Sequence, residues 1–341
     1  MKNDFQLCQM KDYKEHYFHF LDVLRFIAIL LSFLHHSEII FFLHGHTFFF
    51  VLSGFILTYQ ASNEYNRTAS FNWFNFTIRR ALRILPLYFI IVFISYFILP
   101  KLTSQNITLA PIGYYLSLTA NYYSIDHIFI LMILWSVAVQ EQFYLFISFC
   151  YKFFYNYLYQ IAFFMITISI FYNIYAEINN IKIYAHTLNH FSSFGVGIIS
   201  ANLFNSGYLI NSKSIKNIII LILSILFLSL TPLFSGFYWS IIDNPIVSIF
   251  FGFIILFLCN IDVNYNNILI GFFKNLGQFS YGMYCFQGLV ITFGNKILVQ
   301  QFGLSNNFLL SIINFLILIF VAFLSYHFIE QRILKLKKFY R

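Results

Sequence analysis

Long apolar stretches dominate the pattern of hydrophobic and polar positions along this chain. Each approaches the roughly 20 residues that a membrane-spanning helix requires. Ten can be placed, at about 17–35, 40–59, 84–100, 135–154, 158–177, 186–204, 216–233, 244–259, 278–293 and 307–329. We find no internal repeat and no low-complexity linker between them. The pattern therefore predicts an all-α, polytopic membrane helix bundle that forms a single domain over residues 1–341.

Basic residues outside the apolar stretches predict how the bundle is oriented. Lys101, Lys182 and Lys296 fall in the predicted outer loops and Arg25 lies within the first span, which leaves sixteen of the twenty Lys and Arg residues on the other side. Because cytoplasmic loops are enriched in Lys and Arg, both termini are predicted to be cytoplasmic. Residues 1–16 then form a cytoplasmic segment and residues 331–341 a basic cytoplasmic tail. The first apolar stretch lacks a small-residue cleavage site, so we expect it to remain as a span.

The amino-acid composition excludes an ordinary soluble protein and gives little indication of a particular chemical activity. Hydrophobic residues make up 60% of the chain and charged residues only 9%, against roughly 25% charged in a soluble domain. The net charge of +8 follows the predicted topology, so we expect the lipid bilayer and no nucleic acid as a partner. The four cysteines are widely spaced, which favours packing thiols over a disulfide framework or a metal site.

Charged and ionisable residues within the first span are the strongest candidates for function. Asp22 and Arg25 lie three residues apart, so on a helix they share a face and can pair. His36 follows Arg25 by eleven positions, which is three full turns plus roughly 20° and a separation of roughly 16 Å. The pattern therefore predicts that Arg25 and His36 face one channel, with His35 turned away from it. A structural ion pair between Asp22 and Arg25 is the alternative.

Further polar positions each carry a structural and a functional interpretation. Ser53 fits close helix packing better than a nucleophile, because no base or nucleophile elbow accompanies it. His44 and His46 either line an acceptor site at the outer mouth or face lipid headgroups. Glu141 lies at the start of a span, where a charge is costly, so we expect it to have an ion-pair partner or a function. The arginine cluster before the third span suits anionic headgroups, and it equally suits the phosphates of coenzyme A; it comprises Arg79, Arg80 and Arg83.

Six sequence boxes, taken in order over nearly the whole chain, resemble acyltransferase family 3. This family consists of integral membrane enzymes that O-acylate surface polysaccharides, lipopolysaccharide, peptidoglycan and some small molecules. The boxes are LDVLRFIA with Arg25 and His36 separated by ten residues, GHTFFFVLSGF, RRALRILPLY, WSVAVQEQFYL, SYGMYCFQ and HFIEQR. Each box is weak alone, but their order is specific.

The resemblance implies a membrane-bound O-acetyltransferase in a bacterial cell membrane. It would move acetyl from acetyl-CoA, which is a donor substrate and not a tightly bound cofactor, to a hydroxyl of a cell-surface polysaccharide or its lipid-linked precursor. The implied catalytic residues are His36, Arg25, Asp22 and Glu141. Donor binding is implied for Arg79, Arg80, Arg83 and Tyr88, and binding of the carbohydrate acceptor for His46, Ser53, Trp135 and Gln287. No metal is implied.

In the implied mechanism His36 is the general base for the sugar hydroxyl, and Arg25, held by Asp22, stabilises negative charge or orients the donor. Direct transfer and an acyl-histidine intermediate both stay open. Glu141 would orient the histidine.

Departures from the family pattern leave two further alternatives. Gln140 replaces a glutamate, Gln287 a histidine, and His46 with Thr47 a valine and an aspartate, while His190 occupies an arginine position. We expect activity to be retained and acceptor handling to differ. The alternatives are a transporter or flippase, since buried ionisable residues also build proton relays, and a non-catalytic membrane scaffold.

Overall fold

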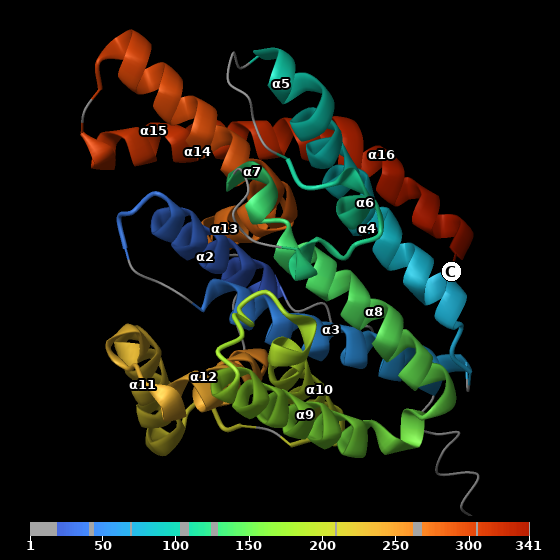
Figure 1. Ribbon diagram of the computed structural model, residues 1–341. Coiled ribbons are helices and arrows are strands. Elements are labelled where there is room, and N and C mark those ends of the chain that lie inside the picture. Colours follow the sequence, from blue (N-terminus) through green and yellow to red (C-terminus); the bar gives the residue numbers. More distant parts are fainter. Residues whose placement is uncertain are drawn as a thin grey trace, which may run out of the picture.

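The computed structural model describes residues 19–40, 44–68, 70–102, 109–123, 129–208, 210–261, 268–304 and 306–340. Within these ranges every regular element is helical, as the apolar pattern predicts (Figure 1). The predicted cytoplasmic segment 1–16 lies outside the described residues. The longer helices are α2 (His19–His36), α3 (Gly45–Thr68), α4 (Trp73–Phe93), α8 (Trp135–Phe153), α9 (Leu158–Ile178), α10 (Phe191–Asn205), α11 (Ile215–Leu230), α12 (Phe237–Cys259), α13 (Ile268–Gln278), α14 (Ser280–Phe302) and α15 (Asn307–Ser325).

Short helices and π-helical turns extend or connect these rods. The connecting elements are α5 (Leu99–Leu102), α6 (Ile112–Leu116), α7 (Phe129–Met132) and α16 (Gln331–Leu334). A π turn at Ile94–Ile98 joins α4 to α5, and another at Tyr326–Glu330 joins α15 to α16. A 3-10 segment, η7 (Lys335–Tyr340), follows α16. Figure 1 shows α16 alongside α4 near the C-terminus, and these two elements are in contact.

Six helical segments of the described residues are long and apolar enough to cross a membrane. They are Trp73–Lys101, Phe129–Phe153, Tyr155–Ile178, Ile215–Leu233, Phe237–Cys259 and Asn307–Tyr340, and they coincide with six of the ten predicted spans. The other four predicted spans also form helices, namely α2, α3, α10 and α14. These four are shorter or carry more polar side chains; α10, for example, has 15 residues. The count of ten spans stays a prediction.

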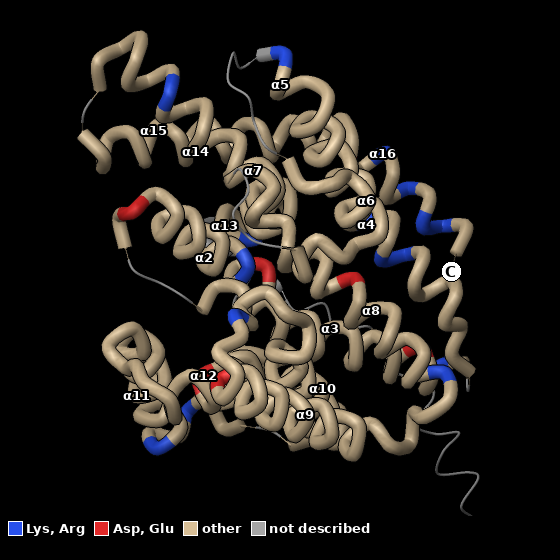
Figure 2. The backbone as a smooth tube through the Cα atoms, viewed as in Figure 1, with Lys and Arg blue, Asp and Glu red and all other residues tan. Residues whose placement is uncertain are grey.

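Apolar side chains cover the outside of the bundle as well as its core. Large hydrophobic residues are exposed along α9, α11 and α15, among them Phe164, Phe171, Ile222 and Phe320. Only lipid is a favourable solvent for such faces, because in water each exposed apolar patch carries a free-energy cost. Figure 2 shows the same feature, since charged residues are sparse over most of the tube. The chain is therefore a membrane protein.

Glycines allow the central helices to approach closely. A Cβ atom at Gly54 of α3 would lie 2.4 Å from the Phe194 carbonyl oxygen, and one at Gly197 of α10 would lie 2.2 Å from the Val51 carbonyl oxygen. At Gly277 of α13 a Cβ atom would lie 2.0 Å from the Asp22 carbonyl oxygen. Small residues at helix crossings permit this backbone contact in membrane bundles. The glycine contacts fix α3 against α10, and α13 against the polar part of α2.

Candidate functional site

Asp22 and Arg25 form the ion pair that their spacing on α2 predicts. The Nη1 atom of Arg25 donates a hydrogen bond to Oδ1 of Asp22. Asp22 is only 2% exposed, and its backbone packs against Gly277 of α13. This arrangement fixes the Arg25 side chain at membrane depth, where an unpaired charge would be costly.

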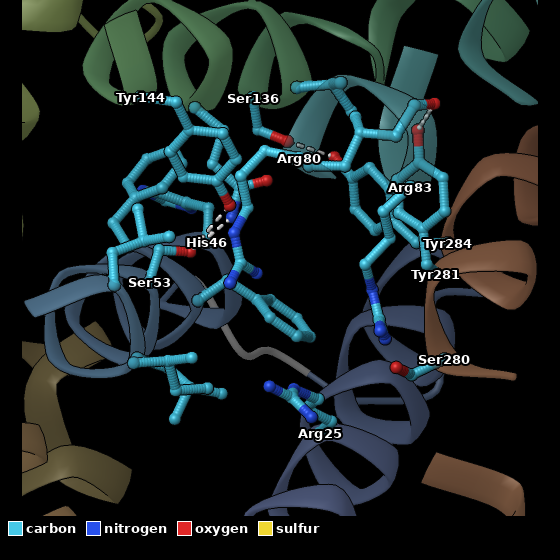
Figure 3. Close-up of a pocket in the computed structure, with 18 of the residues that line it drawn as sticks. Arg25, His46, Ser53, Arg80, Arg83, Ser136, Tyr144, Ser280, Tyr281 and Tyr284 are labelled. Carbon is cyan, nitrogen blue, oxygen red and sulfur yellow. Dashed lines mark hydrogen bonds between the residues drawn. The ribbon is translucent and has the colours of Figure 1, made fainter. Parts of the chain in front are cut away.

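Arg25, Arg80 and Arg83 converge on one cavity of about 130 Å³ (Figure 3). Arg25 comes from α2, and Arg80 and Arg83 come from α4. The charge of Arg80 interacts with those of Arg25 and Arg83, so the cavity concentrates positive charge. Guanidinium groups in a partly desolvated pocket suit phosphate and other anions.

Polar side chains from α3, α8 and α14 complete this cavity. Gln140 donates from Nε2 to Oγ of Ser53 at 2.6 Å, and the Ser53 hydroxyl lies 3.4 Å from that of Tyr144. The hydroxyls of Ser136 and Tyr284 are 2.6 Å apart. Ser53 is therefore held by hydrogen bonds and lines the cavity, as a residue that contacts substrate would. Tyr284 belongs to the SYGMYCFQ box, where sequence reasoning singled out only Gln287.

Arg79 and Tyr88 lie apart from this cavity, although both were expected to bind the donor. Arg79 pairs with Glu64, with Nη2 and Oε2 2.5 Å apart, and donates from Nη1 to the Tyr340 carbonyl oxygen at 2.6 Å. Tyr88 is buried and donates to the Tyr115 carbonyl oxygen at 3.1 Å. In this structure Arg79 links α3, α4 and the C-terminal tail, and Tyr88 is a core residue.

His36 lines two further cavities, of about 100 Å³ and about 480 Å³. The smaller one shares His46, Phe49 and Tyr284 with the arginine cavity. The larger one shares His35 and His36 with the smaller. The three cavities are thus neighbours, and His46 lies between the cavity of the three arginines and the cavity of His36. His35 also lines it, although helix periodicity predicts that His35 is turned away.

His46 stands where the arginine cavity meets the His36 cavity, within a cluster of aromatic rings. Its ring centroid lies 5.2 Å from that of Trp135, 5.1 Å from that of Tyr184 and 5.1 Å from that of His190. Trp135 stacks on His190 at 5.3 Å. The structure thus brings together two predicted acceptor residues, His46 and Trp135, with His190, which replaces an arginine of the family pattern.

His44, which was grouped with His46 at the outer mouth, points elsewhere. It is 4% exposed, and its Nε2 atom lies 3.8 Å from Oδ1 of Asp243 on α12. His44 therefore belongs to the contact between α3 and α12 and lines none of the three cavities described above.

Glu141 and Gln287 are buried without lining these cavities. Glu141 is 5% exposed and close enough to Arg80 for their charges to interact, so the structure gives it an arginine as neighbour. Gln287 is fully buried, and within the described part of the chain neither of its amide atoms has a hydrogen-bond partner. Glu141 thus lies near Arg80 and not beside His36, and Gln287 is a buried residue outside the three cavities.

Lys337 of the C-terminal tail is a basic residue that sequence reasoning did not single out. It is half-buried, whereas Lys335 and Lys338 are exposed, and its charge interacts with those of Arg83, Arg80 and Arg79. The basic tail is visible in the sequence, but the register that turns Lys337 towards α4 is not. The tail thus brings an amino group close to Arg80 and Arg83, which line the arginine cavity.

A helix bundle with lipid-facing apolar surfaces and internal cavities lined by arginine and histidine side chains is a polytopic membrane protein. A family model described as an acyltransferase domain, of the family 3 type, matches residues 18–327. The chain therefore belongs to this acyltransferase family, as the six boxes predict.

Similar curated proteins come from Staphylococcus aureus strains COL, MSSA476 and MRSA252, and each carries the printed name "Putative O-acetyltransferase". Each is 32% identical over 140 residues, a match that covers 37% of this chain and 23% of the relative. The chain thus matches about a quarter of the length of these relatives. No solved structure matches it.

Proposed function

We propose that this chain is a membrane O-acyltransferase that moves an acetyl group from acetyl-CoA to a hydroxyl of a cell-surface carbohydrate. One observation carries the proposal: three neighbouring cavities share lining residues, with three arginines in the first and the His36 imidazole in the other two. Membership of the acyltransferase family and the names of the staphylococcal relatives support the reaction class.

The donor's phosphates are assigned to the arginine end of the passage that these cavities are proposed to form. Arg80 and Arg83 supply guanidinium forks, and Arg25, held by Asp22, supplies a third. In the predicted topology this end faces the cytoplasm, where coenzyme A thioesters are made. Arg79 is assigned a structural role because both of its terminal nitrogens bond to other parts of the protein, Nη1 to Tyr340 and Nη2 to Glu64.

The distance between Arg25 and His36 determines whether both side chains can act on the same reacting group. Eleven helical residues place His36 roughly 16 Å from Arg25, so one oxyanion cannot contact both side chains. Arg25 therefore orients the donor and does not stabilise charge at the reacting carbonyl. A substrate with an extended arm between its phosphates and its thioester bridges such a distance, and acyl-CoA has this form.

His36 is assigned as the general base of the transfer. Its imidazole takes the proton from the acceptor hydroxyl as that oxygen attacks the thioester carbonyl. The new C–O ester bond forms, the C–S bond breaks, and the proton passes to the departing thiolate to give free coenzyme A. The passage equally accommodates a first transfer to the imidazole followed by transfer to the hydroxyl.

The test uses membranes that contain the protein, acetyl-CoA labelled in the acetyl group and cell-surface polysaccharide extracted from the host. His36→Ala is expected to abolish labelling of the polysaccharide at unchanged protein level. His186→Ala is the matched control, because His186 bonds to Tyr172 and lines none of the cavities. Undiminished labelling by His36→Ala contradicts the proposal. A transporter or a scaffold would show no labelling even with the unmodified protein.

A further inference from the structure

The largest of the three linked cavities is a polar vestibule of about 480 Å³ beside His36. Its lining comes from four helices, at the ends that the predicted topology places outside: the end of α2, the start of α7, the second half of α14 and the start of α15. The lining includes a carboxylate, two amides and a hydroxyl, from Glu38, Asn295, Asn307 and Ser311. The arginine cavity has no carboxylate or asparagine in its lining, so the two ends suit different ligands.

Asn295 is oriented by a buried partner. Asn314 of α15 is 2% exposed and donates from Nδ2 to Oδ1 of Asn295 at 2.6 Å. Since this contact uses the Asn295 carbonyl, its amide N–H groups are what it offers to a ligand. Ser311 donates to the Asn307 carbonyl oxygen at 2.9 Å, which leaves the lone pairs of its hydroxyl as acceptors. The vestibule thus presents fixed donors and acceptors together.

Glu38 is held in an uncommon backbone conformation at the rim. Its φ of +60° lies in the left-handed region, which costs a glutamate free energy unless neighbouring contacts enforce it. The Glu38 amide donates to the His35 carbonyl oxygen at 3.0 Å, and the Ile39 amide donates to the Leu34 carbonyl oxygen at 3.0 Å. These bonds end α2 directly after His36. They fix the Glu38 backbone two residues from the imidazole.

An aromatic ring next to the imidazole also lines the vestibule. Phe129 lines the vestibule, and its ring meets that of His36 edge-on, with centroids 5.1 Å apart. A sugar ring offers an apolar C–H face for such a ring and hydroxyls for amides and carboxylates. A lipid alcohol would leave these polar groups unpaired, at a cost in free energy.

We propose that this vestibule is the acceptor site and that it binds one sugar ring, with Glu38, Asn295 and Asn307 on its hydroxyls and Phe129 against its apolar face. The ring then presents one hydroxyl to His36. The inference rests on the proposed transferase function and deepens it. It gives His46 and Trp135 a place further along the passage, between donor and acceptor.

The experiment measures binding and transfer separately, with the full chain in lipid nanodiscs. The ligands are methyl glycosides of glucose, galactose and N-acetylglucosamine, with 1-octanol as an apolar alcohol. Saturation-transfer NMR detects binding, and labelled acetyl-CoA detects transfer. Asn295→Ala and the isosteric Glu38→Gln test the site. Asn179→Ala is the matched control, because Asn179 is exposed on the turn after α9 and its side chain donates to the Tyr175 carbonyl oxygen there, away from the cavities.

At least one glycoside is expected to bind and to be acetylated. Asn295→Ala should raise the KM for that glycoside about tenfold, as loss of one or two hydrogen bonds implies, and should leave the KM for acetyl-CoA unchanged. Glu38→Gln should also raise the KM for the glycoside. Asn179→Ala should change neither the KM for the glycoside nor the KM for acetyl-CoA. The proposal is overturned if no glycoside binds, or if both vestibule variants bind and react like the unmodified protein. Glycoside binding that the two variants weaken, without any transfer, would instead refute the transferase function and leave the sugar site standing.

Discussion

Neighbouring arginines of one motif have different surroundings in the folded protein. Arg80 and Arg83 line the arginine cavity, whereas Arg79 bonds to Glu64 and to the Tyr340 carbonyl oxygen. Helix periodicity cannot separate them, because Arg83 lies within roughly 60° of both others around the helix. The partners of Arg79 come from α3 and from the C-terminal tail, far away in the sequence. A local pattern therefore locates the cluster but not the role of each member.

Replacing Arg83 by alanine is expected to weaken donor binding selectively. The variant loses charge-assisted hydrogen bonds to phosphate, so the KM for acetyl-CoA should rise about tenfold to a hundredfold. Acetyl transfer at varied donor concentration measures this constant. Arg79→Ala serves as the comparison. It should lower thermal stability, because Arg79 ties the tail to α4, and leave the donor KM unchanged; equal effects of both substitutions on KM would contradict the assignment.

At the scale of elements, α2 is the part of the site that the sequence predicted best. The spacing of Asp22 and Arg25 correctly indicated an ion pair. Arg25 and His36 line two neighbouring cavities that share His46, and a common channel for the two side chains stays a prediction. The sequence did not indicate that His46 from α3 and Tyr284 from α14 stand between the two groups. The positions of His46 and Tyr284 depend on packing between helices that are distant in the sequence. The periodicity of a single helix does not predict such packing.

The contact between α3 and α10 is expected to tolerate no added side chain. Gly197→Ala would place a methyl group 2.2 Å from the Val51 carbonyl oxygen, and overpacking of this kind costs roughly 1–3 kcal/mol. The midpoint of thermal unfolding in detergent should fall by several degrees. Gly113→Ala is the control, because its added Cβ meets nothing within 4 Å. Equal midpoints for both variants would show that α3 and α10 do not pack as described.

At the scale of the whole molecule, the all-helical membrane fold follows from the apolar pattern alone. Six predicted spans satisfy strict criteria of length and hydropathy. α2, α3, α10 and α14 fall outside that set, yet α2, α3 and α14 carry Arg25, His46 and Tyr284, which line the arginine cavity. The polar residues that make them functional also lower their hydropathy. Hydropathy therefore predicts membrane crossing least clearly for the helices that carry the site residues.

The predicted orientation is tested by labelling cysteines from outside intact cells. In a variant without the native cysteines, a cysteine replacing Lys182 or Lys296 should react with a membrane-impermeant maleimide. A cysteine replacing Lys152 or Lys213 should react only after the membrane is opened, because these positions lie in predicted inner segments. Labelling of all four positions in intact cells would contradict ten spans with cytoplasmic termini.

The central claim is that one passage holds the donor's phosphates at one end and its reactive end at His36. A cryo-electron microscopy structure of the protein with coenzyme A bound tests this most directly. The account predicts phosphate density against Arg80 and Arg83, with the thiol extending past His46 towards His36. Phosphates in the vestibule beside Glu38, or a thiol directed away from His36, would contradict it.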